Sequence, residues 1–440
     1  MILRDPVHGL VSFESEEEEV IPRLLATPEV QRLRRVRQLG VTSVAFPGAE
    51  HTRFAHALGS AFVMKRLLAR LRQIHHELPF WQQVTTGPAR DALAAALLHD
   101  VGHGPLSHLF EDAIPGTPHH EAWTERIVLD PGTGVHAVLS SFDPGMPDRV
   151  AALVRGEHPF PYLAKAVSGT FDVDRCDYLL RDAHATGVGY GHYDLDWLLR
   201  SLRFTRVEDE ATAPALAIDG AKGLPAIEAF LLARLFMFQQ VYLHKATRAA
   251  EWMIRTALAR VAMVLLEGER VPSVPRAIEL GANGEPFSLG DYLELDDATL
   301  TVAMHAWEGA KDRILADLTQ RIRARSLFKT IELFGEQTTP AGRESALAIA
   351  RDIAVQRGFD PDNYVGLDVA TDTPFEDGNA DGGESYESSS APLVIFAKGR
   401  PRPLREVSFL LGRLAGQVLS RIRLIVAPEL RDDITRALGL

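Results

Sequence analysis

Apolar residues recur at helical spacing over most of the chain between residues 20 and 330. In VIPRLLATPEVQRLRRVRQLG, residues 20–40, the leucines and valines fall on the faces of amphipathic helices. Pro28 interrupts this stretch, so we predict two helices, the second of which begins near Pro28, with Gly40 closing the segment. The same helical period is present in the segments 53–74, 88–102, 227–268 and 291–325. Alternation is rare before residue 325, although 214–219 could form one arm of a small hairpin.

The pattern changes after Arg325, where short apolar runs replace the long helical ones. The runs that indicate strands are FKTIELF (328–334), YVGLDVAT (364–371), PLVIFAK (392–398) and SRIRLIVA (420–427). Helical patterns at 342–358 and 403–419 separate them, which is typical of a small α+β lobe. An acidic stretch rich in Gly and Ser, about 373–391, predicts a mobile loop inside that lobe.

These patterns predict a mainly α fold, with a helical core over residues 1–325 and an α+β lobe over 326–440. A chain of 440 residues with 24% charged residues is typical of a soluble globular protein. The net charge of -12 argues against broad electrostatic binding of nucleic acid. One cysteine, Cys176, excludes an internal disulfide and fits a reducing compartment. Without a secretory segment or an apolar run of about 20 residues, we expect a cytoplasmic protein with no membrane partner.

Candidate chemistry is concentrated in LLHDVGHGPLSHLF, residues 97–110. Its adjacent His99 and Asp100 offer an imidazole and a carboxylate, which are too few ligands to hold a metal by themselves. Two other helical segments carry further ligand types, HTRFAHALG at 51–59 and GTFDVDRCDYLLRDAHATG at 169–187. One metal could take His56, His99, Asp100 and Asp174 and keep open positions for water and a substrate oxygen.

Such a mixed ligand set suits one divalent transition metal, namely Mn, Fe, Zn, Ni or Co, and less exclusively Mg. The absence of cysteine partners argues against a structural zinc site. By itself the fragment is equally compatible with surface pairs or satisfied hydrogen bonds. Gly102, Gly104 and Pro105 break the helix, so His99 and His103 need not share one helical face.

Taken together, the fragments resemble a known family. HTRFAHALG, LLHDVGHGPLSHLFE, HHE and DVDRCDYLLRD occur in the order of the H…HD…D signature of the HD-domain phosphohydrolases. The likeness is greatest to the deoxynucleoside triphosphate triphosphohydrolases (the dGTPase and SAM-and-HD-domain type). DPVHGLVSF and VYLHK extend the resemblance over roughly residues 1–330, and RSLFK continues it beyond.

The resemblance implies roles for individual residues. The implied metal ligands are His56, His99, Asp100 and Asp174, and additional Mg would accompany the nucleotide. The residues that resemble the catalytic set are His103, His108, His120, Glu121 and Glu111. In this set, His103 and His120 would lie against the α-phosphate, and Glu121 would orient His120. His108 would protonate the departing 5′ oxygen, and Glu111 keeps a relay carboxylate where relatives carry Asp.

A further set resembles residues that grip the triphosphate, sugar or base of a nucleotide: Arg53, Arg175, Tyr178, Asp182, Arg234, Tyr242 and Lys245. Gln38 and Leu39 match the pair that reads the sugar 3′ hydroxyl and excludes a 2′ hydroxyl. Arg175 stands where relatives place a lysine, which keeps the charge but changes its shape. Several cations are needed to replace the water around a triphosphate, despite the negative protein.

Gln31, Arg34, Lys222 and Arg325 resemble residues that contact a nucleotide activator between subunits. Ala26 stands where guanine-reading relatives carry an acidic side chain, so a guanine would lose an acceptor for its donors. We therefore expect a different activator, or activity without GTP. The family likeness also implies a homodimer or homotetramer, assembled with the help of the C-terminal lobe.

The implied function is metal-dependent hydrolysis of a deoxynucleoside triphosphate (dNTP) to a deoxynucleoside and inorganic triphosphate, by metal-activated water attacking the α-phosphate. Two alternatives stay open at this point. One is an HD-family phosphatase or phosphodiesterase that acts on nucleotides or nucleic-acid ends. The other is a nucleotide-sensing regulatory protein that retains the pocket.

Overall fold

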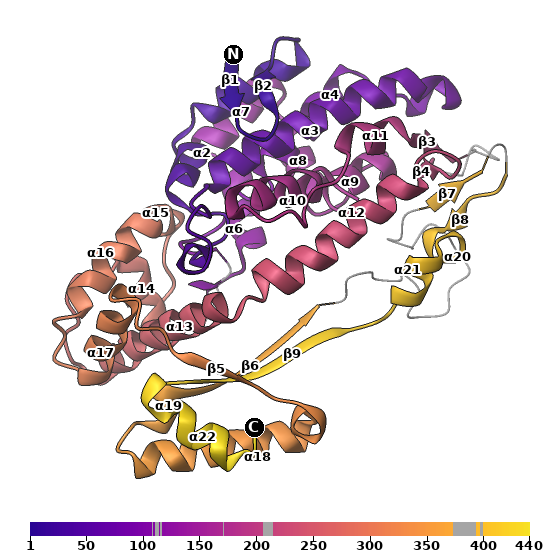
Figure 1. Cartoon of the computed structure of the whole chain (residues 1–440). Coiled ribbons are helices and arrows are strands. Elements are labelled where there is room, and N and C mark those ends of the chain that lie inside the picture. The colour runs from indigo at the N-terminus through magenta and orange to yellow at the C-terminus, as the bar shows by residue number, and fades with distance from the viewer. Residues whose placement is uncertain are drawn as a thin grey trace.

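The computed structural model describes the chain from residue 1 to residue 440, apart from 108, 111–113, 115–116, 170, 206–213, 373–392 and 397–398. Helices make up most of it, and the sheets are small, which confirms the predicted mainly α fold with small sheet regions (Figure 1). The predicted mobile loop at 373–391 lies outside the described residues.

The helices of the first half are α1 (Val20–Leu25), α2 (Pro28–Arg32), α3 (Arg53–Ile74), α4 (Thr86–Leu98), α6 (His120–Leu129), α7 (Gly134–Phe142), α8 (Met146–Val154), α9 (Pro161–Val167), α10 (Val173–Thr186) and α11 (Leu195–Arg200). Those that follow are α12 (Leu224–Met237), α13 (Lys245–Leu266), α14 (Arg276–Ala282), α15 (Leu289–Leu293), α16 (Asp297–Trp307), α17 (Arg313–Arg323), α18 (Pro340–Gln356), α19 (Pro361–Tyr364), α20 (Leu404–Val407), α21 (Phe409–Leu414) and α22 (Arg431–Ala437).

The strands among the described residues form three separate sheets. A hairpin at the N-terminus pairs β1 (Ile2–Asp5) with β2 (Gly9–Ser12). A second sheet has the order β3 (Leu202–Phe204), β4 (Leu216–Asp219), β7 (Leu393–Ile395) and β8 (Arg402–Pro403). A third has the order β5 (Lys329–Glu332), β9 (Leu419–Val426) and β6 (Val365–Asp372), and lies next to α13 and α18 (Figure 1).

Of the boundaries predicted between residues 20 and 40, the division at Pro28 holds, but the second helix ends at Arg32, before a 3-10 turn at Leu33–Arg35, and not at Gly40. The stretch from residue 20 divides at Pro28, as predicted, because proline occupies the first turn of α2. The two longest helical patterns are interrupted. A π-helical turn at Phe238–Tyr242 and an extended His244, which caps α13, separate α12 from α13. Asp296 and Asp312 cap new helices, so 291–325 forms three helices.

Two findings differ from the sequence-based expectation. The N-terminal hairpin was not predicted, because each strand has only four residues. The strand at 393–395 does not pair with the other strands predicted after residue 325 but runs parallel to β4, whose Ala217 and Ile218 are buried. The predicted hairpin arm at 214–219 therefore acquires a partner from far along the chain.

The buried apolar residues gather in two main cores. The first is built from α1, α3, α4, α8, α10 and α12, and it includes Val394, Leu404 and Leu411 from beyond residue 325. The second joins α13 and α17 to the third sheet through residues such as Leu424 and Val365. The region after residue 325 thus contributes to both cores instead of packing as one self-contained lobe. The domain boundary at residue 325 stays a prediction.

One helix among the described residues, Leu224–Tyr242, is long and apolar enough to cross a membrane by length and composition. Of its most apolar window, 44% is buried inside the protein. Ile227, Phe230 and Met237 belong to the first core, which is the alternative use of such a helix. The cytoplasmic location stays a prediction.

Candidate metal centre

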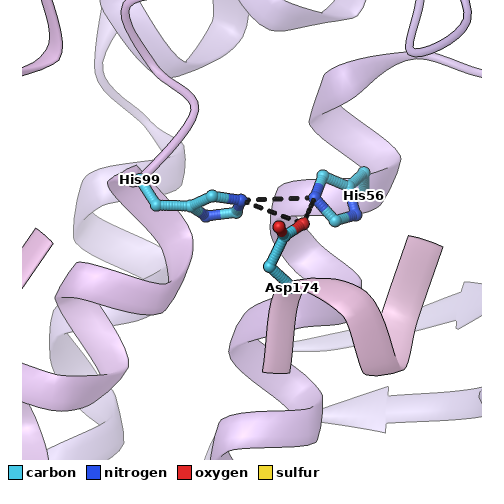
Figure 2. A group of neighbouring side chains, drawn as sticks. All are labelled: His56, His99 and Asp174. Atoms are coloured by element: carbon cyan, nitrogen blue, oxygen red, sulfur yellow. Dashed lines mark hydrogen bonds and ion pairs between the residues drawn. The ribbon is translucent and has the colours of Figure 1, made fainter. Parts of the chain in front are cut away.

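Three helices that are distant in sequence bring the predicted metal ligands together. His56 lies in α3, His99 and Asp100 follow α4, and Asp174 lies in the first turn of α10. The Nε2 atom of His56 is 3.3 Å from Nε2 of His99 and 2.9 Å from Oδ1 of Asp174. Nε2 of His99 is 3.4 Å from the same oxygen. Figure 2 shows the three side chains pointing at a common space between the helices.

Asp100 borders the same space. Its Oδ1 is 3.5 Å from Nε2 of His99, and its Oδ2 is 3.7 Å from Nε2 of His56. Atoms that each bind a metal at about 2.0–2.2 Å lie roughly 3–3.5 Å from one another. His56, His99 and Asp174 therefore have both the chemistry and the spacing to hold a divalent cation, and Asp100 borders the same space while also forming a second group of possible ligands with His103 and His120.

Hydrogen bonds fix the orientation of both imidazoles. Nδ1 of His56 donates to Asp177 (2.8 Å), and Nδ1 of His99 donates to the carbonyl oxygen of Ala96 (3.0 Å). With Nδ1 occupied in this way, Nε2 of each ring faces the other ligands. An outer partner that sets ring orientation is usual for histidines that bind metals.

The close packing of imidazoles and carboxylates in this cluster shifts the pKa values of His56 and Asp174. Burial lowers the pKa of His56, but the hydrogen bonds to Asp174 and Asp177 outweigh burial and raise that pKa to about 10. Burial raises the pKa of Asp174, but the hydrogen bonds from His56 and His99 hold it below its usual range. In the metal-free protein His56 is therefore a cation that donates from both ring nitrogens.

Metal affinity is expected to rise with pH, because the proton on Nε2 of His56 must leave when a cation binds there. Below the His56 pKa of about 10, that proton competes with the metal. From pH 6.5 to 8.5 the apparent affinity for Mn²⁺ should increase by roughly tenfold per pH unit. Titration calorimetry in two buffers of different ionisation enthalpy measures the released proton. An affinity that does not change with pH would contradict this charge state.

A second group of imidazoles adjoins the first through Asp100. Nε2 of His103 is 3.3 Å from Oδ1 of Asp100, and the rings of His103 and His120 are stacked with centroids 3.8 Å apart. Gly102 makes this approach feasible, because a Cβ atom there would collide with the backbone of His120 and Thr124 at the start of α6. The stacked pair is thus in contact with the candidate metal ligands through Asp100.

The predicted sugar and base contacts form a connected group beside the centre. Asp182 is buried and accepts hydrogen bonds from Tyr242 (2.8 Å) and His51 (2.8 Å). The Tyr178 ring lies between the rings of His56 and Tyr242, with centroids 6.4 and 6.3 Å away. The backbone N–H of Gln38 donates to the carbonyl of His51 (3.0 Å). Leu39 packs at the edge of the first core.

The predicted phosphate-binding cations differ in their surroundings. Arg53 is buried and pairs with Asp100, and its Nε donates to Ser107 (3.0 Å), so it faces a candidate metal ligand directly. Arg175 lies 3.8 Å from Asp172, and Arg234 lies over the Phe238 ring. Lys245 is exposed at the start of α13.

Three of the predicted catalytic residues are not seen next to the candidate metal ligands. His108 and Glu111 lie outside the described residues. Glu121 is exposed in the first turn of α6 and borders a cavity together with Val128 and Arg155. Its role in orienting His120 stays a prediction.

Two of the predicted activator residues, Gln31 and Arg34, contact each other within one chain. Arg34 donates to Gln31 (2.8 Å), and Arg325 donates to the carbonyl of Val44 (2.7 Å). Lys222 lies elsewhere, on a cavity of about 340 Å³ that is also lined by Arg70, Trp197, Arg200 and Arg203. This separation is compatible with a site completed by another subunit.

Sequence reasoning missed the residues that support the centre from behind. His8, Arg181 and Ser107 were given no role, although each lies within one of the quoted motifs. His8 and Arg181 contact Asp177, and Ser107 contacts Arg53. The available signal was a charged or imidazole side chain inside an otherwise apolar segment, which requires a partner when it is buried.

Comparisons with known proteins agree with the geometry. A model of the HD domain matches residues 53–182, and a model of the HD associated region matches residues 194–270. The uncharacterized protein YwfO of Bacillus subtilis is 35% identical over 375 residues, which cover 85% of this chain and 81% of YwfO. The deoxynucleoside triphosphate triphosphohydrolase SAMHD1 of Danio rerio is 25% identical over 394 residues, 80% of this chain but only 59% of SAMHD1.

Solved structures show the same fold. A phosphohydrolase from Bacteroides thetaiotaomicron has a TM-score of 0.78 and 26% identity, covering 97% of this chain and 99% of that chain. The HD-domain match spans all four candidate metal ligands, from His56 to Asp174. The resemblance inferred from the sequence motifs is confirmed: this chain belongs to the HD-domain superfamily of phosphohydrolases and is similar to its deoxynucleoside triphosphate triphosphohydrolases.

Proposed function

We propose that this protein hydrolyses deoxynucleoside triphosphates to deoxynucleosides and inorganic triphosphate. The proposal is carried by one observation, the convergence of His56, His99, Asp100 and Asp174 next to a stacked pair of imidazoles. A divalent cation held by these four residues would supply Lewis acidity at the scissile phosphate. Mn, Fe, Zn, Ni or Co suits the two nitrogen and two oxygen ligands.

The remaining chemistry belongs to side chains of this chain. His103 and His120 present imidazoles, the side chain whose usual pKa is best suited to moving protons near neutral pH. Asp100 lies between His103 and His99, so it links the proton-transfer pair to the metal ligands. Arg175, Arg234 and Lys245 would neutralise the triphosphate, as charge-assisted hydrogen bonds do. His108 and Glu111 would complete the acid relay.

The residues around Asp182 support a nucleoside as the leaving group of the reaction. Oε1 of Gln38 is buried and has no hydrogen-bond partner among the described residues. A buried acceptor of this kind is costly unless a ligand supplies a donor, and a sugar 3′ hydroxyl is such a donor. Tyr178 and Tyr242 offer aromatic faces, and Leu39 would crowd a 2′ hydroxyl. A phosphatase for simple monophosphates would not require this extended set.

The decisive test is incubation of the Mn²⁺-loaded protein with each dNTP and each matching NTP, followed by chromatographic separation of products. We expect deoxynucleoside and triphosphate in equal amounts, with little turnover of ribonucleotides. Pyrophosphate or single phosphate would instead indicate the phosphatase or phosphodiesterase alternative. Nucleotide binding without turnover would indicate the regulatory alternative.

The same assay with and without GTP tests the proposal for activation. Since Ala26 offers no acceptor to a guanine, we propose that GTP is not required. Gln31, Arg34, Lys222 and Arg325 would contact an activator only across subunits of a homodimer or homotetramer. A strict requirement for GTP would overturn this part.

A further inference from the structure

A chain of buried charged side chains connects His56 to the N-terminal hairpin. Oδ2 of Asp177 accepts hydrogen bonds from Nδ1 of His56 (2.8 Å) and Nε of Arg181 (2.8 Å). Oδ1 of Asp177 accepts from Nε2 of His8 (2.7 Å) and Nη2 of Arg181 (2.9 Å). The side chains of all four residues are at most 3% exposed. Every acceptor direction of this carboxylate is therefore filled by a donor.

The hairpin is shaped to deliver His8 to this position. Oδ1 of Asp5 accepts hydrogen bonds from the backbone N–H groups of Val7 (2.9 Å) and His8 (2.9 Å), which forms the turn between β1 and β2. The other oxygen, Oδ2 of Asp5, accepts from Nη1 of Arg181 (2.8 Å). The same aspartate thus builds the turn and joins it to α10.

A glycine in α3 leaves the space that this arrangement needs. Gly59 lies one helical turn after His56, in the interior of α3, where glycine costs about 1 kcal/mol relative to alanine. A Cβ atom at residue 59 would collide with the Asp177 carboxylate and the Arg181 guanidinium. Glycine, which has no side chain, therefore leaves room for Asp177 and Arg181 beside Nδ1 of His56.

The charges of Asp5, Asp177 and Arg181 do not cancel among themselves. Asp5 and Asp177 carry two negative charges, and Arg181 supplies one positive charge. His8 donates its Nε2 hydrogen to Asp177. Asp5, Asp177 and Arg181 therefore leave one negative charge behind His56, on the side opposite the candidate metal ligands. That charge favours a positive charge on the imidazole or on a cation bound to it.

We propose that Asp177 is a positioning residue of the metal centre, and that His8 of the N-terminal hairpin, together with Arg181, holds it in place. Asp177 keeps the His56 hydrogen on Nδ1, so that Nε2 is the ligand atom presented to the cation. The hairpin is in this way a component of the metal centre, although it lies outside the HD-domain match at 53–182. This inference rests on the proposed function only in taking His56 as a metal ligand.

The test is titration of the metal-free full-length protein with Mn²⁺, followed by electron paramagnetic resonance of the free ion. Asp177→Asn replaces one acceptor oxygen by a donor and is expected to weaken Mn²⁺ binding about 10–100-fold, the usual effect of losing an outer partner. His8→Ala should weaken binding in the same direction by a smaller factor. Dichroism reports whether each variant is folded.

A matched control is Lys65→Met. Lys65 also ties the N-terminal segment to α3, by donating to the carbonyl of Ser12 (2.7 Å) and to Glu18 (3.1 Å), but it does not touch Asp177. Its Mn²⁺ affinity should equal that of the wild type. The nucleotide turnover lost in Asp177→Asn should be regained at saturating Mn²⁺, which a general structural defect would not allow.

The outcomes separate this inference from the proposed function. If the wild type binds no divalent cation, the proposed metal centre fails, and this inference fails with it. If the wild type binds Mn²⁺ and both Asp177→Asn and His8→Ala bind it equally well, only the positioning role is overturned. If Asp177→Asn does not fold, the test is the comparison of Mn²⁺ affinity between His8→Ala and the control Lys65→Met. Equal affinities would overturn the positioning role.

Discussion

His99→Ala is expected to lose metal binding and nucleotide hydrolysis together while the protein stays folded. His99 contributes one of the two imidazoles of the centre, and its other ring nitrogen bonds only to the Ala96 carbonyl of its own helix. Truncation therefore leaves no buried charge without a partner, unlike truncation of Asp100, which would strand the buried Arg53.

The expected losses of metal affinity and turnover in His99→Ala can be estimated from the contribution of one metal ligand. Loss of an outer partner alone costs about 10–100-fold in metal affinity, so loss of a ligand should exceed about 100-fold. Without the several kcal/mol that a metal contributes, turnover should fall at least about 10³-fold, since each 1.4 kcal/mol is about tenfold.

Metal content after dialysis against Mn²⁺, thermal unfolding by dichroism and dNTP turnover measure the three consequences. His136→Ala is a suitable control, because His136 is also a helical histidine but its side chain contacts Ser140 in α7, away from the centre. If His99→Ala retained a full complement of metal, the ligand assignment would be wrong.

His103→Ala is expected to separate the two properties, with metal retained and turnover reduced by about 10²–10⁴-fold, the usual contribution of a positioned proton-transfer group. The ring of His103 is buried, contacts Asp100 and stacks on His120, and it belongs to the group of Asp100, His103 and His120 rather than to the group of His56, His99 and Asp174.

The stacking gives this prediction a second measurable consequence. Since we propose that His103 and His120 act on the same group, the double alanine variant should lose less than the product of the two single losses. Single-turnover rates at saturating Mn²⁺ provide the comparison. Independent, multiplying losses would show that the two imidazoles do not act as a unit, and loss of metal from His103→Ala would move it into the ligand set.

The sequence was most informative where a chemical signature is local. The pair His99 and Asp100, the proline that opens α2 and the helical period of α3 each depend on neighbouring residues alone. The ligand set of His56, His99, Asp100 and Asp174 came from a resemblance of ordered motifs. Their convergence depends on the packing of α3 against α4 and α10, which no single motif encodes.

Sequence reasoning failed where the partner is remote. His8 bonds to a carboxylate 169 positions away, and nothing near it in the chain indicates that contact. Arg53, which the resemblance places against a phosphate, also pairs with Asp100, a contact that the sequence did not indicate, and its phosphate contact stays a prediction. Both cases are choices between alternative partners that only the tertiary arrangement decides.

The parallel pairing of β4 with β7 bears on how the molecule is made. During synthesis, β4 leaves the ribosome long before residues 393–395 exist, so its open edge must wait until β7 has been synthesised. Unpaired edges of this kind attract other chains, and contacts between remote segments form slowly. The nascent protein is therefore exposed to self-association until β7 has left the ribosome, and chaperones that shield strand edges should raise the yield of folded molecules.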